Sequence, residues 1–332
     1  MREYPSPAVR RTPRRARGLP RRVSAAVEAA LEYGVGGVPR SPAPGAPTAR
    51  PASGVRRLAA NCRALARACH PLPSAAVTAM VTAVAAGAGR GTAGSAGVGA
   101  AVLAGQLSVG WCNDAVDARR DAVAGRFDKP AATGELSPRA LGLAAGAALA
   151  ACVPLSLLGG REAAAAHLTG VVFGGWAYDL GLKGTVLSPL PYAVGFGVLP
   201  AFVTLGLPGA PWPAWWAVSG AALLGVGAHL VNVLPDLDAD RATGVRGLPH
   251  RLGAARVRRI APAVLLTAVA TMALGPAGAA RPTDWAVLAA AAATAGLGVG
   301  VPDADSTVPF RAAVAVAGLT VLLLVMRADT LT

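Results

Sequence analysis

Long apolar runs separated by short polar segments make up most of this chain after residue 70. A run of about 20 residues is enough for a helix to cross the hydrocarbon core of a bilayer. Such runs occur nine times, at residues 73–92, 94–112, 140–159, 163–182, 188–207, 214–234, 260–279, 285–301 and 309–326. Because lipid offers no hydrogen-bond partners to backbone N–H and C=O groups, the runs are predicted to be helices and not strands.

The composition agrees with insertion into a membrane. The 332 residues are 54% hydrophobic and only 14% charged, with a mean hydropathy of +0.49. These values exclude an ordinary soluble globule. Small residues dominate the apolar runs, which allows helices to approach one another closely in lipid. We therefore predict an all-α integral membrane protein with nine transmembrane helices, formed by a membrane domain at residues 68–328.

The first 67 residues have a different character. They contain fourteen Arg and three Glu and are rich in Pro and Ala, so they are predicted to form a disordered cytosolic arm. Residues 23–33 have the pattern of a short amphipathic helix, and the arm lacks the apolar run of a cleavable signal peptide. The Arg residues show no pattern of alternation with aromatic residues that would favour nucleic acid as a partner. Contact with anionic lipid is the favoured interpretation.

Basic residues in the loops predict the orientation. With a cytoplasmic N-terminus, the loops on the cytoplasmic side hold thirteen Lys and Arg residues and those on the opposite side hold four. An excess of this kind marks the cytoplasmic side of membrane proteins. The loops after the second and sixth apolar runs would then both face the cytoplasm.

An acidic cluster lies at the end of each of these two apolar runs, just before the loop. The first cluster, WCNDAVDARRD, contains Asn113, Asp114, Asp117 and Asp121. Spacings of three and four place the three carboxylates on one face of a helix. Like charges so close together repel one another unless a cation lies between them. Mg²⁺ is the natural candidate, since it accepts one or two carboxylates and completes its shell with water and phosphate oxygens.

The second cluster, NVLPDLDAD, repeats this arrangement. Asn232, Asp236 and Asp240 are four residues apart, whereas Asp238 points away from their face. Pro235 lies inside the run and is expected to interrupt the helix there. One such cluster alone could be a solvated loop or a helix cap. Two clusters at the same edge of a membrane, where charge is costly, favour a divalent-metal site.

Basic residues that could bind a phosphate lie near both clusters. The chain has only two Lys among its 31 basic residues: Lys129 follows the first cluster and Lys183 follows the fourth run. A diphosphate carries more charge than one Mg²⁺ neutralises, so its site should also contain Lys or Arg. Lys183 is favoured for this role, ahead of Lys129 and Arg126. Alternatively, Lys183 pairs with Asp179, four residues before it.

These motifs resemble those of the UbiA superfamily of intramembrane prenyltransferases. NDAVDARRD is similar to the family signature NDxxDxxxD, and NVLPDLDAD is similar to its second motif, NDLPDxxGD, with Val233 in place of the usual Asp. RFDKPAATGELS resembles the segment that follows the first motif, although Arg and Lys have exchanged places and one residue is inserted. WAYDLGLKGT resembles a Tyr-to-Lys segment of the family. The resemblance covers roughly residues 65–327.

The resemblance implies nine transmembrane helices around a central cavity, with the Asp motifs on the cytoplasmic side. It implies that the chain binds Mg²⁺ and the diphosphate of a C10–C20 isoprenyl donor. The implied metal ligands are Asp114, Asp117, Asp121, Asp236 and Asp240. The implied catalytic residues are Asp114, Asp117, Asp236, Lys183 and Tyr178. The expected substrate-binding residues are Asn113, Arg126, Lys129, Asn232, His229 and Trp111.

The roles of three of these residues have alternatives. Tyr178 and Trp111 could stabilise a carbocation by cation–π attraction, or could serve in packing or at the membrane interface. His229 lies on the face of Asn232 and Asp236 and could contact substrate, or could form a hydrogen bond between helices. His70, near the start of the first apolar run, could line the mouth of the cavity or simply cap the interface.

Three functions are compatible with the sequence. The favoured one is transfer of an isoprenyl group to a lipophilic or aromatic acceptor within the membrane. A membrane-embedded terpene cyclase would use the same metal site without a separate acceptor. A transporter with acidic gates is disfavoured, because the carboxylates lie at the ends of apolar runs and coupling sites lie near the bilayer midplane.

Overall fold

The computed structural model describes residues 54–299 and 308–332. Every regular element in these two ranges is a helix, which confirms the all-α prediction. Residues 23–33, the predicted short amphipathic helix, lie outside the described ranges.

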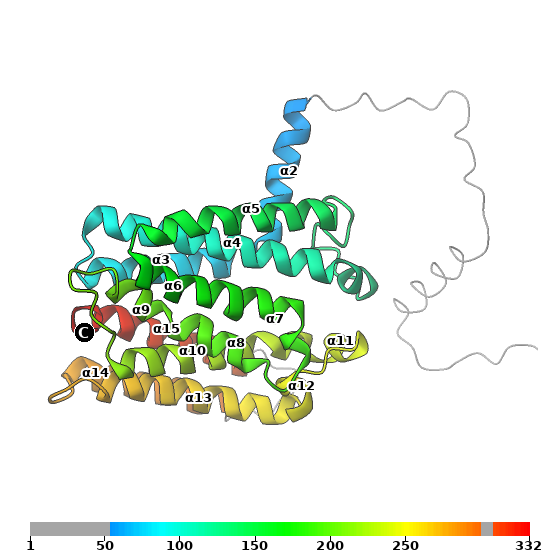
Figure 1. The fold of residues 1–332 in the computed structure, drawn as a ribbon. Helices are drawn as coiled ribbons and strands as arrows, with labels where there is room; N and C mark the ends of the chain where they lie inside the picture. The colour runs from blue at the N-terminus through cyan, green and yellow to red at the C-terminus, as the bar shows by residue number, and fades with distance from the viewer. Residues whose placement is uncertain (1–53, 300–307) are drawn as a thin grey trace, which may run out of the picture. The chain divides into compact units, whose positions relative to one another are not determined.

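The apolar runs correspond to the main helices of Figure 1. Five helices are long and apolar enough to cross a membrane, and up to six if α2 (Gly54–Ala68) and α3 (Pro71–Gly87), bent by 68°, count as one span. The chain is therefore a multi-pass membrane protein, while nine spans and a cytoplasmic N-terminus stay predictions. The helices are α3 (Pro71–Gly87), α4 (Gly91–Val123), α5 (Pro138–Leu157), α6 (Arg161–Thr169), α8 (Pro189–Gly197), α9 (Leu199–Thr204), α10 (Trp215–Val233), α13 (Ala254–Leu274), α14 (Pro282–Val299) and α15 (Val308–Met326).

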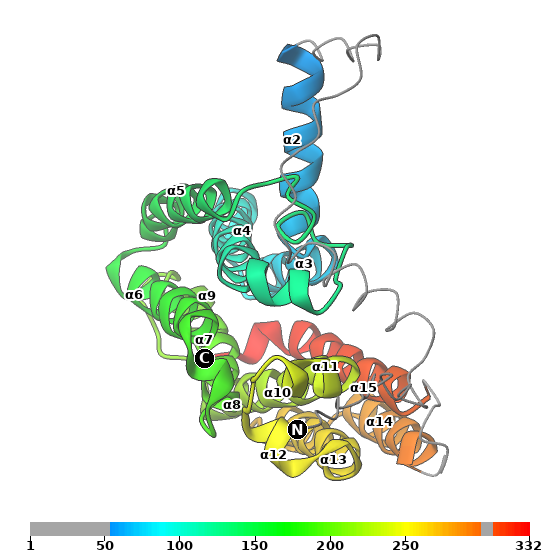
Figure 2. The same ribbon diagram turned by 90° about the vertical axis from the view of Figure 1, so that its right-hand side faces the viewer.

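The helices form a closed ring of contacts. Going around it, α3 packs on α4, α4 on α5, α5 on α6, α6 on α9, α9 and α8 on α10, and α10 on α13 and α15. The ring closes where α15 meets α3, and Figure 2 shows most of these helices nearly end-on. Phe202, Leu265, Met272 and Leu323 are fully buried in the main core.

Three breaks in the helices shape the middle of this ring. After α6 the chain forms a π-helical segment, η1 (Gly170–Trp176), before α7 (Ala177–Leu180). There a Cβ on Gly174 would lie 2.7 Å from Cα of Gly195, so only glycine permits this approach of η1 to α8. A second break separates α8 from α9. The third, at Pro235, was predicted: a 3-10 turn, η3 (Leu234–Asp236), separates α10 from α11 (Leu237–Ala242), because proline lacks the N–H that an α-helix needs.

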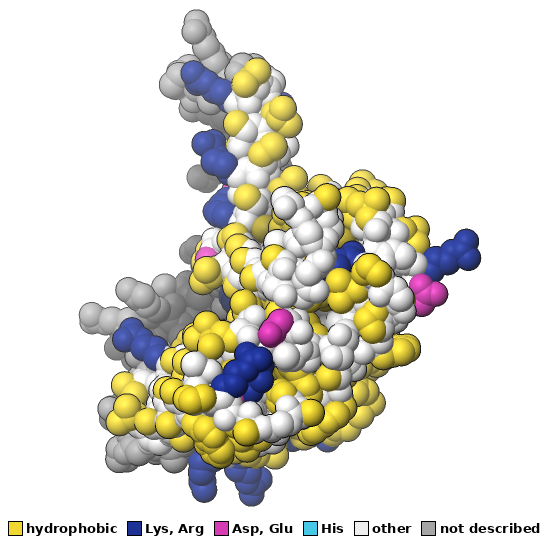
Figure 3. Space-filling model, turned by 90° about the vertical axis from the view of Figure 1, so that its left-hand side faces the viewer, with side chains coloured by type: hydrophobic (Ala, Val, Ile, Leu, Met, Phe, Trp, Pro, Cys, Tyr) yellow, Lys and Arg dark blue, Asp and Glu magenta, His cyan; other side chains and the backbone are white. Residues whose placement is uncertain are grey.

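The last part of the predicted disordered arm is a helix instead. Residues 54–67 belong to α2 (Gly54–Ala68), whereas the division of the chain into an arm and a membrane domain at residue 67 stays a prediction. Arg56 and Arg63 lie on one side of α2 and exposed Val55 and Leu58 on another, a separation of basic and apolar side chains visible in Figure 3. The C-terminal end of α2 is held by a hydrogen bond from Trp111 Nε1 to the carbonyl of Leu65 at 2.9 Å.

Candidate active site

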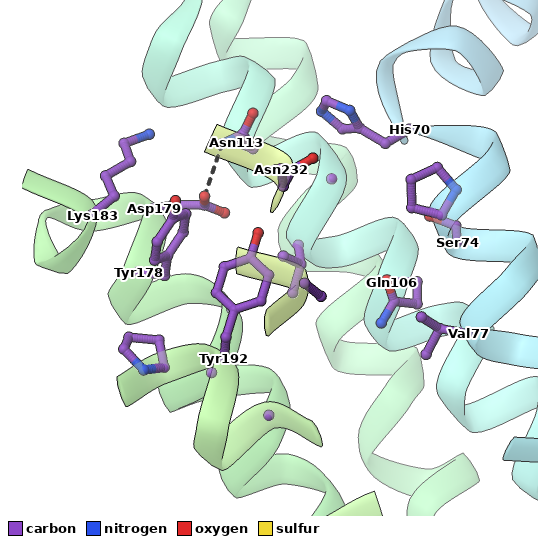
Figure 4. A pocket seen from close by; sticks show the side chains of 18 of the residues that line it. His70, Ser74, Val77, Gln106, Asn113, Tyr178, Asp179, Lys183, Tyr192 and Asn232 are labelled. Atoms are coloured by element: carbon purple, nitrogen blue, oxygen red, sulfur yellow. Dashed lines mark hydrogen bonds between the residues drawn. The ribbon is translucent and has the colours of Figure 1, made fainter. Parts of the chain in front are cut away.

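One cavity of about 470 Å³ contains most of the residues singled out in the sequence. It is bounded by α3, α4, the η1–α7 segment, α8 and α10 (Figure 4). Along α4 its lining changes from mainly apolar, at Val102 and Val109 with Gln106 between them, to polar, at Asn113, Asp117 and Asp121. The polar end also receives the second acidic cluster, through Asn232, Asp236 and Asp240.

Lys129 binds two carboxylates of the first cluster. Its Nζ lies 3.0 Å from Asp114 Oδ1 and 3.0 Å from Asp121 Oδ2. The turn that follows α4 carries Lys129 back to these residues, where it is 8% exposed. Burial lowers the pKa of Lys129, but the attraction of Asp114 and Asp121 outweighs this and the pKa is raised overall. Lys129 therefore stays protonated at the polar end of the cavity.

Lys183 binds the third carboxylate. It lies in the 3-10 turn η2 (Leu182–Gly184) that follows α7, and its Nζ is 2.6 Å from Asp117 Oδ1. Arg120 forms an ion pair with the other oxygen of Asp117. The alternative predicted partner, Asp179, accepts a hydrogen bond from Asn113 Nδ2 at 2.9 Å instead. Lys183 and Asn113 thus join α4 to the segment around α7, as Figure 4 shows for Asn113 and Asp179.

The second cluster meets basic groups in the same way. Arg126 Nη1 lies 3.0 Å from Asp236 Oδ2, and His250 Nε2 lies 3.2 Å from Asp240 Oδ2. Burial lowers the pKa of Arg126, but attraction to Asp236 and other carboxylates raises it above its usual value. Asp238 has a fully exposed side chain and faces away, as its helical phase predicts. The pair of Arg126 and Asp236 links the two acidic clusters.

Three predicted residues do not line the cavity. Trp111, expected to bind substrate, turns towards α2 because its indole N–H donates to the backbone there. His229, also expected to bind substrate, is 1% exposed and lies behind Tyr178 and Tyr192, with Nε2 3.1 Å from Ser188 Oγ. That hydrogen bond joins α10 to the residue before α8, and a contact of His229 with substrate stays a prediction. Asp114 is 1% exposed and faces Lys129 and His70.

Other lining residues were not assigned to the site from the sequence. Asp179 is buried, and its Oδ2 has no hydrogen-bond partner in the described ranges. It stands beside Tyr178 in the recognised segment WAYDLGLKGT, and this position was its only signal. His250 had a similar signal, in the segment that follows the second motif. Arg120 lies within the first motif, NDAVDARRD, and His167 had no signal in the sequence.

The donor set suits Mg²⁺ without forming a closed metal site. Asp117, Asp121, Asp236 and Asp240 line one end of the cavity together with Asn113 and Asn232. Among the described residues, no group of three or more His, Cys, Asp or Glu side chains is arranged to hold a metal ion. Mg²⁺ needs only one or two carboxylates, because water and substrate phosphate complete its shell. The oxygen ligands present at this end fit that requirement.

If this end of the cavity binds the diphosphate that the motif resemblance implies, replacing Lys183 by Ala should weaken that binding. A hydrogen bond to a charged group contributes about 1.5–3 kcal/mol, so we expect donor KM to rise at least about tenfold. Lys183→Arg retains the charge and should lie between Ala and the wild type. Steady-state diphosphate release at varied donor concentration measures this effect. Equal donor KM and kcat in Lys183→Ala and the wild type would exclude Lys183 from the diphosphate site.

Solved structures share this fold. Two structures of a UbiA homologue from Archaeoglobus fulgidus, bound to GPP and Mg²⁺ and to DMAPP and Mg²⁺, are each 16% identical with a TM-score of 0.58. Each match covers 81% of this chain, and 100% and 99% of the homologue. A structure described as digeranylgeranylglyceryl phosphate synthase is 15% identical with a TM-score of 0.59, covering 83% of this chain and 100% of that one. At such identities the likeness shows the fold.

The family follows from the sequence comparison. No curated protein matches the chain. The model of the UbiA prenyltransferase family matches residues 74–326, which include both Asp clusters and every helix around the cavity from the first turn of α3 onwards. The resemblance of the two motifs is thereby confirmed, and this chain belongs to the UbiA prenyltransferase family.

Proposed function

We propose that this chain is an Mg²⁺-dependent prenyltransferase that uses an allylic isoprenyl diphosphate. It would join the isoprenyl group to a lipophilic or aromatic acceptor within the membrane and release diphosphate. One observation carries the proposal: a single cavity has carboxylates, amides and cations at one end and apolar side chains at the other. The solved relatives that bind GPP or DMAPP with Mg²⁺ support it.

The basic residues would exchange partners when the donor binds. Without substrate, each lysine is neutralised by a carboxylate: Lys129 by Asp114 and Asp121, and Lys183 by Asp117. A diphosphate offers these ammonium groups, and Arg126, a stronger set of anionic oxygens. Mg²⁺ held by Asp117, Asp121, Asp236 and Asp240 would supply further positive charge to the leaving diphosphate. The carboxylate of Asp114, behind Lys129, would hold that lysine in position.

Aromatic residues lie beside the polar end. Tyr178 and Tyr192 both line the cavity, with ring centroids 5.1 Å apart in an edge-to-face arrangement. Figure 4 shows both rings below Asn113 and Asn232. An aromatic face stabilises a nearby cation by its quadrupole. We assign this role towards the allylic cation to Tyr178, with Tyr192 as a second candidate and His229 packed behind both rings.

A second fate of the same cation is cyclisation on its own double bonds. Both fates begin with ionisation of the donor, and they differ in whether a separate acceptor is consumed. The observation that favours cyclisation is an imidazole, that of His167, at the apolar end of the cavity. In either case we propose that the polar end faces the cytoplasm, where soluble Mg²⁺ and diphosphate are exchanged.

Removal of Mg²⁺ tests the proposal. Purified protein in nanodiscs would receive geranyl, farnesyl or geranylgeranyl diphosphate, with or without an extract of lipids and aromatic compounds. We expect diphosphate release with Mg²⁺ and its loss in excess chelator, restored by added Mg²⁺. Release that needs the extract would identify transfer to an acceptor. Two results would overturn the proposed function. One is diphosphate release that chelator does not reduce, and the other is no release from any of the three donors in Mg²⁺, either with or without the extract.

A further inference from the structure

The apolar end of the cavity contains one imidazole whose surroundings orient it. His167 of α6 is 3% exposed and lines the cavity beside Gly105, Val171 and Gly170. Its ring stacks on Phe202, with centroids 4.3 Å apart and planes 11° from parallel. The ring is therefore fixed in orientation, with one edge towards the cavity and the other towards α5.

The contacts at Nδ1 determine where the ring proton lies. Ser156 Oγ is 2.8 Å from Nδ1, but its hydroxyl hydrogen is donated to the carbonyl of Cys152 at 2.7 Å. The thiol of Cys152, 3.8 Å from Nδ1, donates to the carbonyl of Ala101. The tautomer with its proton on Nδ1 satisfies all of these contacts together: Nδ1 donates to Ser156, while the Ser156 hydroxyl and the Cys152 thiol keep their bonds to backbone carbonyls. A neutral imidazole with its proton on Nδ1 has an unprotonated Nε2.

Nε2 has no hydrogen-bond partner among the described residues and is directed at the cavity. A Cβ added at Gly105 of α4 would lie 2.8 Å from Val171 Cγ2 and 3.5 Å from Nε2. Glycine at this position therefore lets α4 pass close to the imidazole without a side chain over Nε2. The lone pair of Nε2 thus lies in a mainly apolar part of the cavity, whose lining also includes the amide of Gln106.

The lone pair of Nε2 lies far from the polar end of the cavity. Gly105 precedes Asn113 by eight residues of α4, a rise of about 12 Å along the helix axis. In transfer to an acceptor, the acceptor attacks the first carbon of the donor, beside the diphosphate. A base that removes the acceptor's proton must lie about 3 Å from the acceptor atom that bears this proton, and therefore near the diphosphate. His167 is too deep for that role. It lies where the distal part of an isoprenoid tail would pass.

We propose that His167 Nε2 removes the proton that ends the cyclisation named above as the second fate of the cation, so that, when no acceptor is bound, this chain converts an allylic isoprenyl diphosphate into a neutral cyclic hydrocarbon. The proposal rests on the ionisation step proposed above. Attack of a distal double bond on the first carbon forms a ring bond and leaves the positive charge on a distal carbon. Nε2 takes a proton from the carbon next to that charge, and the C–H electron pair becomes the new double bond. The imidazolium gives up its proton to water that enters when the product leaves.

Ser156 acts as a positioning residue in this scheme. By accepting the hydrogen bond from Nδ1, it holds the tautomer that leaves Nε2 basic and stabilises the imidazolium that forms. Ser156 itself does not line the cavity.

The test compares products as well as turnover in His167→Gln. Protein in nanodiscs would be supplied with Mg²⁺ and each of the three allylic diphosphates without an acceptor, and diphosphate and extracted products would be measured together. We expect cyclic hydrocarbon from the wild type. In His167→Gln, the rate of diphosphate release should stay within a few fold of the wild type. The hydrocarbon formed per diphosphate released should fall at least about tenfold, because water adds to the cation and gives alcohols instead.

Two further variants separate chemistry from packing. Ser156→Ala should shift products in the same direction by less, because the imidazole remains but its tautomer is no longer held. Cys152→Ala removes a buried neighbour of the same ring without touching the cavity, and its product ratio should match the wild type. An unchanged ratio in His167→Gln, or an equal change in Cys152→Ala, would refute a role for His167 as a base.

The outcomes also distinguish this inference from the proposed function. If the wild type releases diphosphate only when an acceptor extract is added and forms no hydrocarbon, transfer stands and the role of His167 is refuted. If no diphosphate is released under any condition, both fail together. Hydrocarbon formation that His167→Gln abolishes supports both the ionisation step and the deep base.

Discussion

Replacing Asp236 by Asn should abolish most diphosphate release without unfolding the protein. Asp236 lines the polar end of the cavity and pairs with Arg126, yet its side chain is 42% exposed and that of Arg126 35%. Ion pairs with this exposure contribute about 0–1 kcal/mol, so thermal stability should change little. Loss of a group that stabilises charge in the transition state typically lowers kcat by about a hundredfold to a thousandfold. The measurement is Mg²⁺-dependent diphosphate release beside thermal unfolding.

Asp238 provides the matched control for this variant. It lies two residues further along the same acidic run, and its side chain is fully exposed and directed away from the cavity. Asp238→Asn removes the same charge from the same segment, so it should retain activity within about twofold of the wild type, like most surface substitutions. Equal damage from the two substitutions would mean that net charge near the loop, and not the position of Asp236, determines activity.

Replacing Lys129 by Met should produce the largest loss of stability. Lys129 is the shared partner of Asp114 and Asp121, and all three side chains are at most 9% exposed. Removing one partner of a buried ion pair costs about 3–5 kcal/mol, because the remaining charge loses its compensation. For a chain of this size we expect Tm to fall by roughly 6–12 °C. Thermal unfolding in nanodiscs, followed by intrinsic fluorescence, would measure it.

Lys129→Arg separates charge from shape in this prediction. It retains a positive group between the two carboxylates and should recover much of the lost Tm, although the guanidinium is larger than the ammonium it replaces. Lys129→Met with wild-type stability would show that Asp114 and Asp121 are neutralised by other groups. The position assigned to Lys129 between α4 and the following turn would then be wrong.

The positions of the helices and the helical face of each acidic cluster were predictable from the sequence. The length of an apolar run and the 3.6-residue period of a helix depend only on residues that are close together in the chain. Both can therefore be identified from the sequence without knowing how the helices pack. The break at Pro235 was predictable for the same reason, since it follows from one missing N–H. The outward direction of Asp238 also follows from phase alone.

Directions of side chains on other helices were less predictable. Trp111 and His229 were predicted to lie near substrate because they are close in the sequence to Asn113 and Asn232, respectively. The structure turns Trp111 to α2 and places His229 behind two tyrosine rings, because each finds a hydrogen-bond partner from another segment. An apolar helix in lipid can bury any face, so periodicity does not indicate which face meets which neighbour.

The sequence by itself determined that this protein is a helical membrane protein with two acidic motifs whose carboxylates recur at helical spacing. Only the tertiary structure decided which cation neutralises each carboxylate. For example, Lys183 forms an ion pair with Asp117 and not with Asp179, which is closer to it in the sequence. It also decided that His167 opens onto the cavity that holds those carboxylates. The physical reason is that ion pairs and cavity walls join residues tens of positions apart, and their distances depend on how the helices pack.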